Sequence, residues 1–364
     1  MRKTVLMFAV LAGITAAIVV VAGTIILSGV IPIKASSRHW PITAALLDFV
    51  KVRSVATHSI GISVPFLDDP SLVLRGAGHY ETGCKPCHGS PERPLPKIPA
   101  GMTPHPPDLH QQVSRWQPEE LFYIVKHGIK FTGMPAWPAA GRDDEVWAIA
   151  AFLRTLPEMD AEGYARLVGA TSDAASQEDP VGPSTAVLAL AGAACGRCHG
   201  VDGRGRENAA FPRLAGQRVE YLRLALEAYA SGSRHSGMMA PVAAGLSAGT
   251  MREVAEYYGG LAPAAGDGAA APRGAEIAAR GIPAQEVPAC AECHGPASTD
   301  HNPAYPRLAG QFPEYLVLQL RLFADGRRGG SPYAHIMGKI APRLTDAQMS
   351  DVAAYYGSLP TAAP

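Results

Sequence analysis

The N-terminal part of the chain is dominated by one long apolar run. Two cations, Arg2 and Lys3, are followed by the uncharged stretch from Val5 to Ile33. A helix needs about 20 apolar residues to cross a bilayer, so this run predicts a membrane-spanning helix. The alternative is a cleaved signal peptide, whose apolar region is only about 7–15 residues long and precedes a small-residue cleavage site. The length of the run and the poor cleavage site at 35–37 favour a retained anchor, residues 1–37.

Beyond the anchor, the apolar positions follow the period of amphipathic helices and show no convincing alternation of the strand type. Helices are predicted, for example, over 118–127 and 143–156. Gly- and Pro-rich connections separate these helices. The predicted fold class is therefore all-α, with small helical domains following the membrane helix.

Repeats and linkers set the predicted domain organisation. RLAGQ occurs at 213–217 and at 307–311, each time followed by an amphipathic helix, a methionine-bearing loop and a helix ending in Tyr-Tyr-Gly. Stretches of small, polar, Pro or Gly residues at 171–183 and 262–273 are typical of linkers. The predicted segments are the anchor at 1–37, a linker with a short helix at 38–70, a first domain at 71–160, a linker at 161–183, a second domain at 184–261, a linker at 262–273 and a third domain at 274–364.

Charge narrows the classes of partner. The chain has 364 residues with 32 Lys and Arg against 32 Asp and Glu, so its formal net charge is zero. Because no basic patch is evident, we expect no nucleic-acid partner.

All six cysteines fall in three copies of the pattern Cys-x-x-Cys-His. The copies are Cys84, Cys87 and His88; Cys195, Cys198 and His199; and Cys290, Cys293 and His294. This pattern predicts covalent haem attachment, in which the two thiols add to the haem vinyl groups and the histidine binds the iron as its proximal ligand. Three haem c groups are therefore the expected cofactors. They also supply apolar core to domains of 80–100 residues that would otherwise be marginally stable.

Other readings of a Cys-x-x-Cys pair fit less well. A zinc site pairs such motifs in twos, which would leave one of the three copies without a partner. A redox dithiol needs no histidine directly after the second cysteine. No cysteine is left over for a separate disulfide.

Each domain resembles a class I c-type cytochrome in its order of helix, CxxCH, further helices, distal methionine and closing helix. Through CHG, PRLAGQ and the Tyr-Tyr helix, the second and third domains together resemble the tandem diheme c-four-type cytochromes. Through PPDL at 106–109, HGIKFTGMPAW at 127–137 and DDEVWAIAAFL at 143–153, the first domain resembles anchored monohaem cytochromes.

The resemblance implies a methionine as the second axial ligand of each iron. In the first domain Met134 is the candidate, since Met102 lies only 14 residues after the histidine and Met159 lies beyond the closing helix. In the third domain Met337 is the candidate. Aligning GMMAPVAAGL with HIMGKIAPRL favours Met239 over its neighbour Met238 in the second domain, although both remain open.

The resemblance also implies residues around the histidine. The carbonyls of Pro212 and Pro306 are expected to accept the imidazole N–H, with the matching proline of the first domain being 106 or 107. Arg213 and Arg307 are candidates for neutralising haem propionates.

The expected function is electron transfer between a membrane or periplasmic dehydrogenase, or a quinol-oxidising complex, and a terminal acceptor such as an oxidase. The alternatives are a multihaem enzyme, such as a peroxidase or sulfur-compound oxidase with one open haem site, and a redox sensor. The positive-inside rule places the haem domains on the periplasmic face of a bacterial inner membrane. Because their sequences are duplicates, we expect the second and third domains to form one compact body, with the first attached more loosely.

Overall fold

The computed structural model describes residues 2–31, 33–34, 36–93, 95–169, 189–206, 209–295 and 302–360. These residues form helices and two isolated β-bridges but no strand, which confirms the all-α prediction. The linker predicted at 171–183 and the beginning of the second domain, 184–188, lie outside the described residues.

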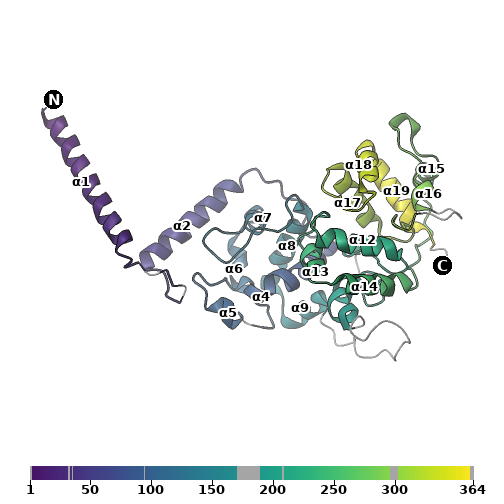
Figure 1. The fold of residues 1–364 in the computed structure, drawn as a ribbon, viewed down its shortest axis with the longest axis horizontal. Coiled ribbons are helices and arrows are strands. Elements are labelled where there is room, and N and C mark those ends of the chain that lie inside the picture. The colour runs from purple at the N-terminus through teal and green to yellow at the C-terminus, as the bar shows by residue number, and fades with distance from the viewer. Residues whose placement is uncertain are drawn as a thin grey trace.

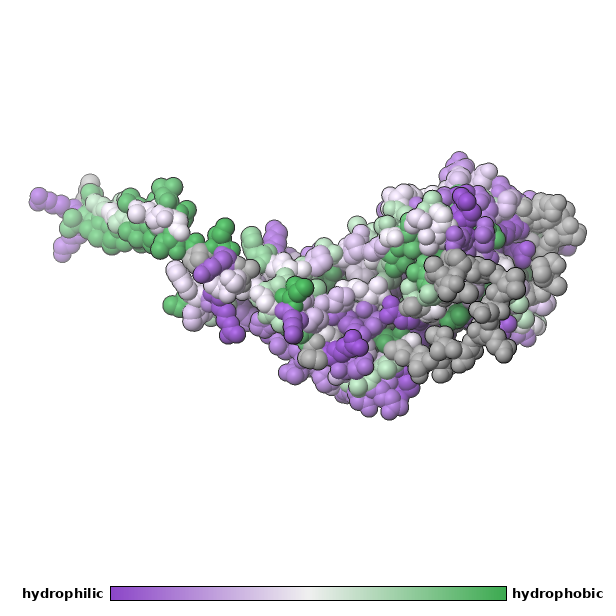
Figure 2. All heavy atoms as spheres, turned by 60° about the horizontal axis from the view of Figure 1, so that its bottom comes forward, coloured by the Kyte–Doolittle hydropathy of each residue, from purple (hydrophilic) through white to green (hydrophobic). Residues whose placement is uncertain are grey.

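Helix α1 (Arg2–Leu27) projects from the rest of the protein, as Figure 1 shows. It contains no buried residue, and Figure 2 shows that its apolar surface lies away from the helical domains. By length and composition α1 is able to cross a membrane, and a signal sequence would have the same features. Helix α2 (Pro41–His58) follows, longer than the short helix expected within 38–70.

The first domain is built around the crossing of its first and closing helices. Its helices are α3 (Pro70–His79), the π-helix η1 (Tyr80–Cys84), α4 (Lys85–His88), α5 (Lys97–Ala100), α6 (Leu109–Gln112), η2 (Val113–Arg115), α7 (Pro118–His127), α8 (Asp143–Thr155), η3 (Leu156–Glu158) and α9 (Ala161–Val168). A Cβ on Gly76 would lie 1.9 Å from the carbonyl oxygen of Ala148, so α3 and α8 meet backbone to backbone at this point. This close approach permits the dense core around Phe152.

Helix α9 corrects one predicted boundary. Residues 161–168 were expected to belong to a linker, but Tyr164 and Val168 are buried in the core of the first domain. The helix begins after Asp160, whose side chain accepts the N–H of Gly163, and it ends at Gly169 in the left-handed conformation. The first domain therefore extends to residue 168.

The second and third domains have the same arrangement of helices. The second contains η5 (Ala191–Cys195), α11 (Gly196–His199), α12 (Val219–Ala230), α13 (Met239–Ala244) and α14 (Ala248–Gly260). The third contains α15 (Pro272–Arg280), η7 (Pro283–Gln285), α16 (Ala291–His294), α17 (Pro313–Ala324), α18 (Ala334–Ile340), η8 (Ala341–Arg343) and α19 (Asp346–Ser358). In both, a buried tyrosine on the closing helix, Tyr258 or Tyr356, packs against the helix before the cysteine motif.

The first domain packs closely on the second, contrary to the loose attachment expected from the sequence. The guanidinium of Arg206 donates to the carbonyl oxygens of Arg166 and Leu167 at 2.9 and 2.6 Å, and so caps the C-terminus of α9. Phe211 is buried with Leu74 between the two domains. Helix α9 and the start of α3 thus bind the first domain to the second.

Candidate haem-binding sites

The last four residues of each Cys-x-x-Cys-His motif form one short helical turn, and the first cysteine directly precedes it. The turns are α4, α11 and α16, and each ends at a glycine with positive φ. These glycines, Gly89, Gly200 and Gly295, have φ of 71°, 79° and 78°, a conformation that other residues rarely adopt. The chain therefore leaves each turn sharply, directly after the histidine.

A tyrosine hydroxyl forms a hydrogen bond with the carbonyl oxygen of each of these glycines. Tyr80 donates to the carbonyl oxygen of Gly89 at 2.9 Å, and Tyr356 donates to that of Gly295 at 2.8 Å. In the second domain, Tyr258 lies 3.4 Å from the Gly200 oxygen. The Tyr-Tyr-Gly repeat is evident in the sequence, but no role was predicted for its tyrosines. Their recurrence at the same position of two domains was the available signal.

The three motif histidines make the same hydrogen bond. Nδ1 of His88, His199 and His294 lies 2.9, 3.0 and 3.0 Å from the carbonyl oxygens of Pro107, Pro212 and Pro306, respectively. Since a carbonyl only accepts, Nδ1 carries the proton, and in the neutral ring the lone pair therefore lies on Nε2. This is the tautomer that binds a metal through Nε2. In the first domain the accepting proline is thus Pro107 rather than Pro106.

Burial shifts the pKa of several of these groups in the direction that favours the uncharged form. Burial lowers the pKa of His88 and His199, although the hydrogen bond to the proline carbonyl acts in the opposite direction. Burial raises the pKa of Cys84 to about 12 and also raises the pKa of Cys195 and Cys290. A redox dithiol has a lowered thiol pKa, so these environments disfavour that reading.

The candidate distal methionines lie on the loop or short helix that precedes each closing helix. Met134 follows Gly133, and a Cβ on Gly128 would lie 2.6 Å from the Met134 carbonyl oxygen. The turn at Gly128 thus holds this loop close. Met239 is the first residue of α13 and Met238 directly precedes it; both are partly buried. Met337 lies within α18 and packs against the buried cluster of Phe323, Ala334 and Ala341.

Two other methionines have distinct places. Met349 is buried in the core of the third domain, as expected for a residue on the closing helix. The Cε of Met102 lies 2.2 Å from where a Cβ on Gly133 would be, so Met102 reaches the loop that carries Met134. Sequence distance alone did not predict that proximity.

Arg213 and Arg307 lie at the interface of the second and third domains. The guanidinium of Arg307 donates to the Gly216 carbonyl oxygen at 3.1 Å, and that of Arg213 donates to the Gly310 carbonyl oxygen. Nε of Arg213 is buried and has no hydrogen-bond partner within the described structure. An unpaired buried donor at this position fits a carboxylate of a bound group, such as a haem propionate.

The two glutamines of the repeated RLAGQ segments had no predicted role, but both lie at this interface. Nε2 of Gln217 donates to the Arg307 carbonyl oxygen at 2.9 Å, and its Oε1 accepts the Arg307 N–H at 2.7 Å. Gln311 makes the same pair of bonds with Arg213, both at 3.0 Å. The interface is therefore reciprocal, with each domain offering the other the same residues. Identity of the glutamine in both repeats was the signal in the sequence.

Taken together, the three motifs fit a covalently attached haem. Each brings two cysteines one helical turn apart and an imidazole that donates through Nδ1, so that its lone pair lies on Nε2. In each, the proline carbonyl fixes the tautomer and orientation of that imidazole.

Comparison with known proteins gives matches at both ends of this region. The family described as cytochrome c oxidase, cbb3-type, subunit III matches residues 71–153, and the cytochrome c family matches residues 272–360. A "Thiosulfate dehydrogenase electron acceptor" of Thiomonas intermedia (strain K12) is 38% identical over 173 residues, which cover 46% of this chain and 79% of that protein. A "Cytochrome c4" of Stutzerimonas stutzeri is 31% identical over 183 residues, covering 46% of this chain and 85% of that protein.

Among solved structures, reduced recombinant cytochrome c4 from Pseudomonas stutzeri covers 49% of this chain and 100% of its own, with 30% identity and a TM-score of 0.45.

Proposed function

Since the chain belongs to the cytochrome c family, a group of electron carriers with covalently bound haem c, we propose that it carries three haems and relays electrons on the outer face of a membrane. The observation that carries this proposal is the repetition, in all three domains, of the hydrogen bond from the motif histidine to a proline carbonyl. Bound haem supplies an iron that changes between its ferric and ferrous states by one electron.

The proposed roles of the residues follow from their positions. Cys84, Cys87, Cys195, Cys198, Cys290 and Cys293 attach the haems, His88, His199 and His294 are the proximal ligands, and Met134, Met239 and Met337 are the distal ligands. The carbonyls of Pro107, Pro212 and Pro306 orient the proximal rings and increase their basicity. Methionine–histidine ligation raises the reduction potential and closes the iron to substrates, which suits a carrier rather than an oxidase or peroxidase.

Partners are proposed from chemistry and from the relatives. A relative named for accepting electrons from thiosulfate dehydrogenase supports a sulfur-compound dehydrogenase as the class of donor. Helix α1 would hold the domains at the inner membrane, within reach of a quinol-oxidising complex or a terminal oxidase. Anchoring favours short encounters with such membrane partners because it confines both to one surface.

The haem count tests the proposal directly. Matured protein should retain three haems per chain after denaturation, as measured by intact mass and by a pyridine haemochrome assay. Replacing His199 by alanine should leave the three attachments and remove one low-spin iron. A mass that corresponds to fewer than three haems in the matured wild-type protein would contradict the proposal.

The distal ligand of the second haem is tested by a matched pair of variants. Met239→Ala should convert that haem to a high-spin or weakly ligated form with a lower potential, because the methionine favours reduced iron. Met238→Ala should keep the low-spin signal and lose only packing. The opposite pattern would assign the ligand to Met238.

A further inference from the structure

A buried carboxylate of the first domain lies against the methionine loop of the second. Glu145 on α8 is 3% exposed. Its Oε1 accepts the Ser236 hydroxyl at 2.6 Å and lies 3.0 Å from the Arg142 guanidinium. Its Oε2 accepts the Gly237 N–H at 2.7 Å and the indole N–H of Trp137 at 2.9 Å. Four donors thus converge on the two oxygens, which is the full accepting capacity of a carboxylate.

Ser236 links the carboxylate of Glu145 to the backbone of the two methionines through hydrogen bonds. Because its hydroxyl proton is donated to Glu145, the oxygen lone pairs remain to accept N–H groups. They accept the backbone N–H of Met238 at 3.3 Å and of Met239 at 3.1 Å. The carboxylate of one domain is therefore connected, through one hydroxyl, to the backbone of the residue proposed to bind iron in the next.

The contact also requires a glycine. A Cβ on Gly237 would lie 2.3 Å from the ring of Trp137, so only a residue without a side chain lets the indole lie this close to the loop. Trp137 follows the first domain's Met134 by three positions in the chain. Its backbone N–H donates to the Lys126 carbonyl oxygen at 3.1 Å, which holds the segment to the end of α7.

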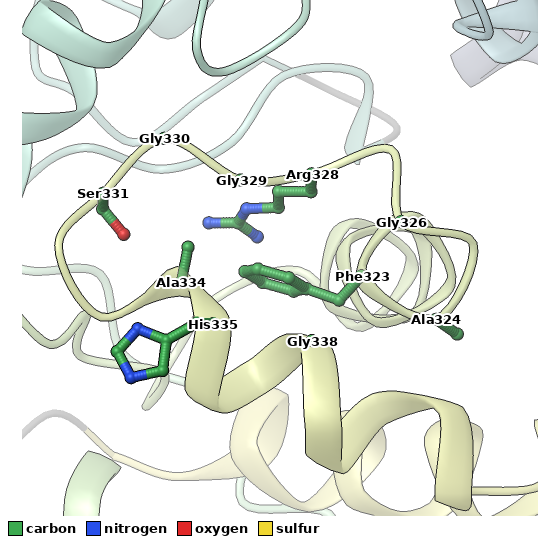
Figure 3. Close-up of a pocket in the computed structure, with 10 residues that line it drawn as sticks. All are labelled: Phe323, Ala324, Gly326, Arg328, Gly329, Gly330, Ser331, Ala334, His335 and Gly338. Atoms are coloured by element: carbon green, nitrogen blue, oxygen red, sulfur yellow. The ribbon is translucent and has the colours of Figure 1, made fainter.

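The third domain provides an internal comparison. Aligning Met239 with Met337 pairs Ser236 with Ala334 and Gly237 with His335, so the third domain has neither the hydroxyl nor the glycine. There, Ala334 and His335 line an open hollow of about 420 Å³ next to Phe323 and Arg328, as Figure 3 shows. Both methionine loops belong to the repeated unit, but of the two only the loop of the second domain carries the Ser-Gly pair.

We propose that Glu145 of the first domain is a positioning residue for the distal ligand of the second haem. Held by Trp137 and Arg142, its carboxylate fixes Ser236, and Ser236 fixes the backbone at Met239. The first domain thereby sets how firmly the second haem is ligated, and with it that haem's reduction potential. The inference rests on the proposed role of Met239 as the ligand.

The test uses the full-length holoprotein in detergent and follows the second haem. Glu145→Gln keeps the size of the side chain but replaces one accepting oxygen by an NH₂ group, so either Ser236 or Gly237 loses its acceptor. Ser236→Ala removes the link to the methionine backbone and leaves the other contacts of Glu145 in place. The matched control is Ser247→Ala, which removes the side chain that caps α14 in the same domain without touching the first domain.

The readouts are the iron-bound methionine methyl resonance of the reduced second haem and its midpoint potential. Both test variants should broaden or lose this resonance and lower the potential, while the first and third haems and the Ser247→Ala protein remain unchanged. Each tenfold weakening of methionine binding that is confined to the ferrous state lowers a one-electron potential by about 59 mV. If Glu145→Gln does not fold, Ser236→Ala alone decides.

Three results would overturn the inference: an unchanged second haem in a folded Glu145→Gln protein, an unchanged second haem in Ser236→Ala, or an equal shift in Ser247→Ala. Met239→Ala separates this failure from failure of the proposed ligand. If Met239→Ala removes the methionine resonance and Ser236→Ala does not alter it, the ligand assignment stands and the positioning role is wrong. If Met239→Ala leaves the resonance in place, the ligand assignment itself is wrong.

Discussion

Replacing Gln217 by alanine should weaken the interface between the second and third domains. The side chain makes three hydrogen bonds: Nε2 donates to the Arg307 carbonyl oxygen, and Oε1 accepts the N–H groups of Arg307 and Arg218. A hydrogen bond contributes about 1 kcal/mol net, and a buried group left without a partner costs about 1–3 kcal/mol. Since these atoms are partly buried, we expect the free energy of unfolding to fall by about 2–4 kcal/mol.

The assay is thermal unfolding of the holoprotein, followed by far-ultraviolet circular dichroism. For a body of this size, 1 kcal/mol corresponds to about 2–4 °C, so the melting temperature should fall by about 4–16 °C. Gln311→Ala should cause a similar loss. The double variant should lose less than the sum, because both glutamines hold one interface.

Gln111→Ala is the matched control, since Gln111 is exposed on α6. Its effect should stay within about 0.5 kcal/mol. If Gln217→Ala unfolds at the same temperature as Gln111→Ala, the reciprocal glutamine contacts do not hold the two domains together, and the reasoning is refuted.

Three further predictions concern other parts of the chain. Gly76→Ala should destabilise the first domain by about 3 kcal/mol or more in denaturant unfolding, since the added methyl meets the backbone of α8. Gly83→Ala, the control, has open space at its Cβ and should be nearly neutral. Burial and the nearby cations Arg75 and Arg142 lower the pKa of His79 to about 3. The unfolded chain binds a proton near pH 6.5, so stability should fall by about 3 kcal/mol between pH 6.5 and pH 4, and His79→Leu should flatten that slope in melting curves. The full-length chain should stay in membranes through high-salt washing, while a chain that starts at Ser36 behind a cleavable signal should be soluble with the same haem spectrum.

Each of these has an outcome that contradicts it. Equal unfolding midpoints for the two glycine variants would mean that α3 and α8 separate at little cost. An acid slope that persists in His79→Leu would assign the pH dependence to other groups. A mature N-terminus near residue 35 in native protein would identify α1 as a cleaved signal.

Features encoded within a short stretch of sequence were predictable. The cysteine motifs and the RLAGQ repeats indicated where the histidines, prolines and glycine turns would lie, because each acts on residues close to it in the chain. Helix α9 also had local signals, Asp160 before it and Gly169 after it, but its residues were included in the linker with the neighbouring stretch at 171–183. Its helical character follows from the burial of Tyr164 and Val168, one turn apart on the same face.

Contacts between distant segments were not predictable. Glu145 lies on the same stripe of α8 as Ile149 and Phe152, where a charged residue is unexpected. Its partners Ser236 and Gly237 come about 90 residues later in the chain. A single sequence shows the misplaced charge but does not say which segment satisfies it, and so the close packing of the first two domains was missed.

The reciprocal interface between the second and third domains has a consequence for how the chain is ordered. In such an isologous contact the same residues of each domain bind the other domain. The interface is therefore complete with two copies, and no further copy can join along the same axis. A further domain must therefore pack away from the two-fold axis of this pair, against one of its two equivalent sides. The first domain packs on the loop around Gly237 in the second domain, whereas the equivalent loop of the third domain borders an open hollow, so the two halves are unequal. The pair of similar domains thereby has two different ends: one whose methionine loop contacts the first domain at Trp137, and one whose methionine loop borders the hollow.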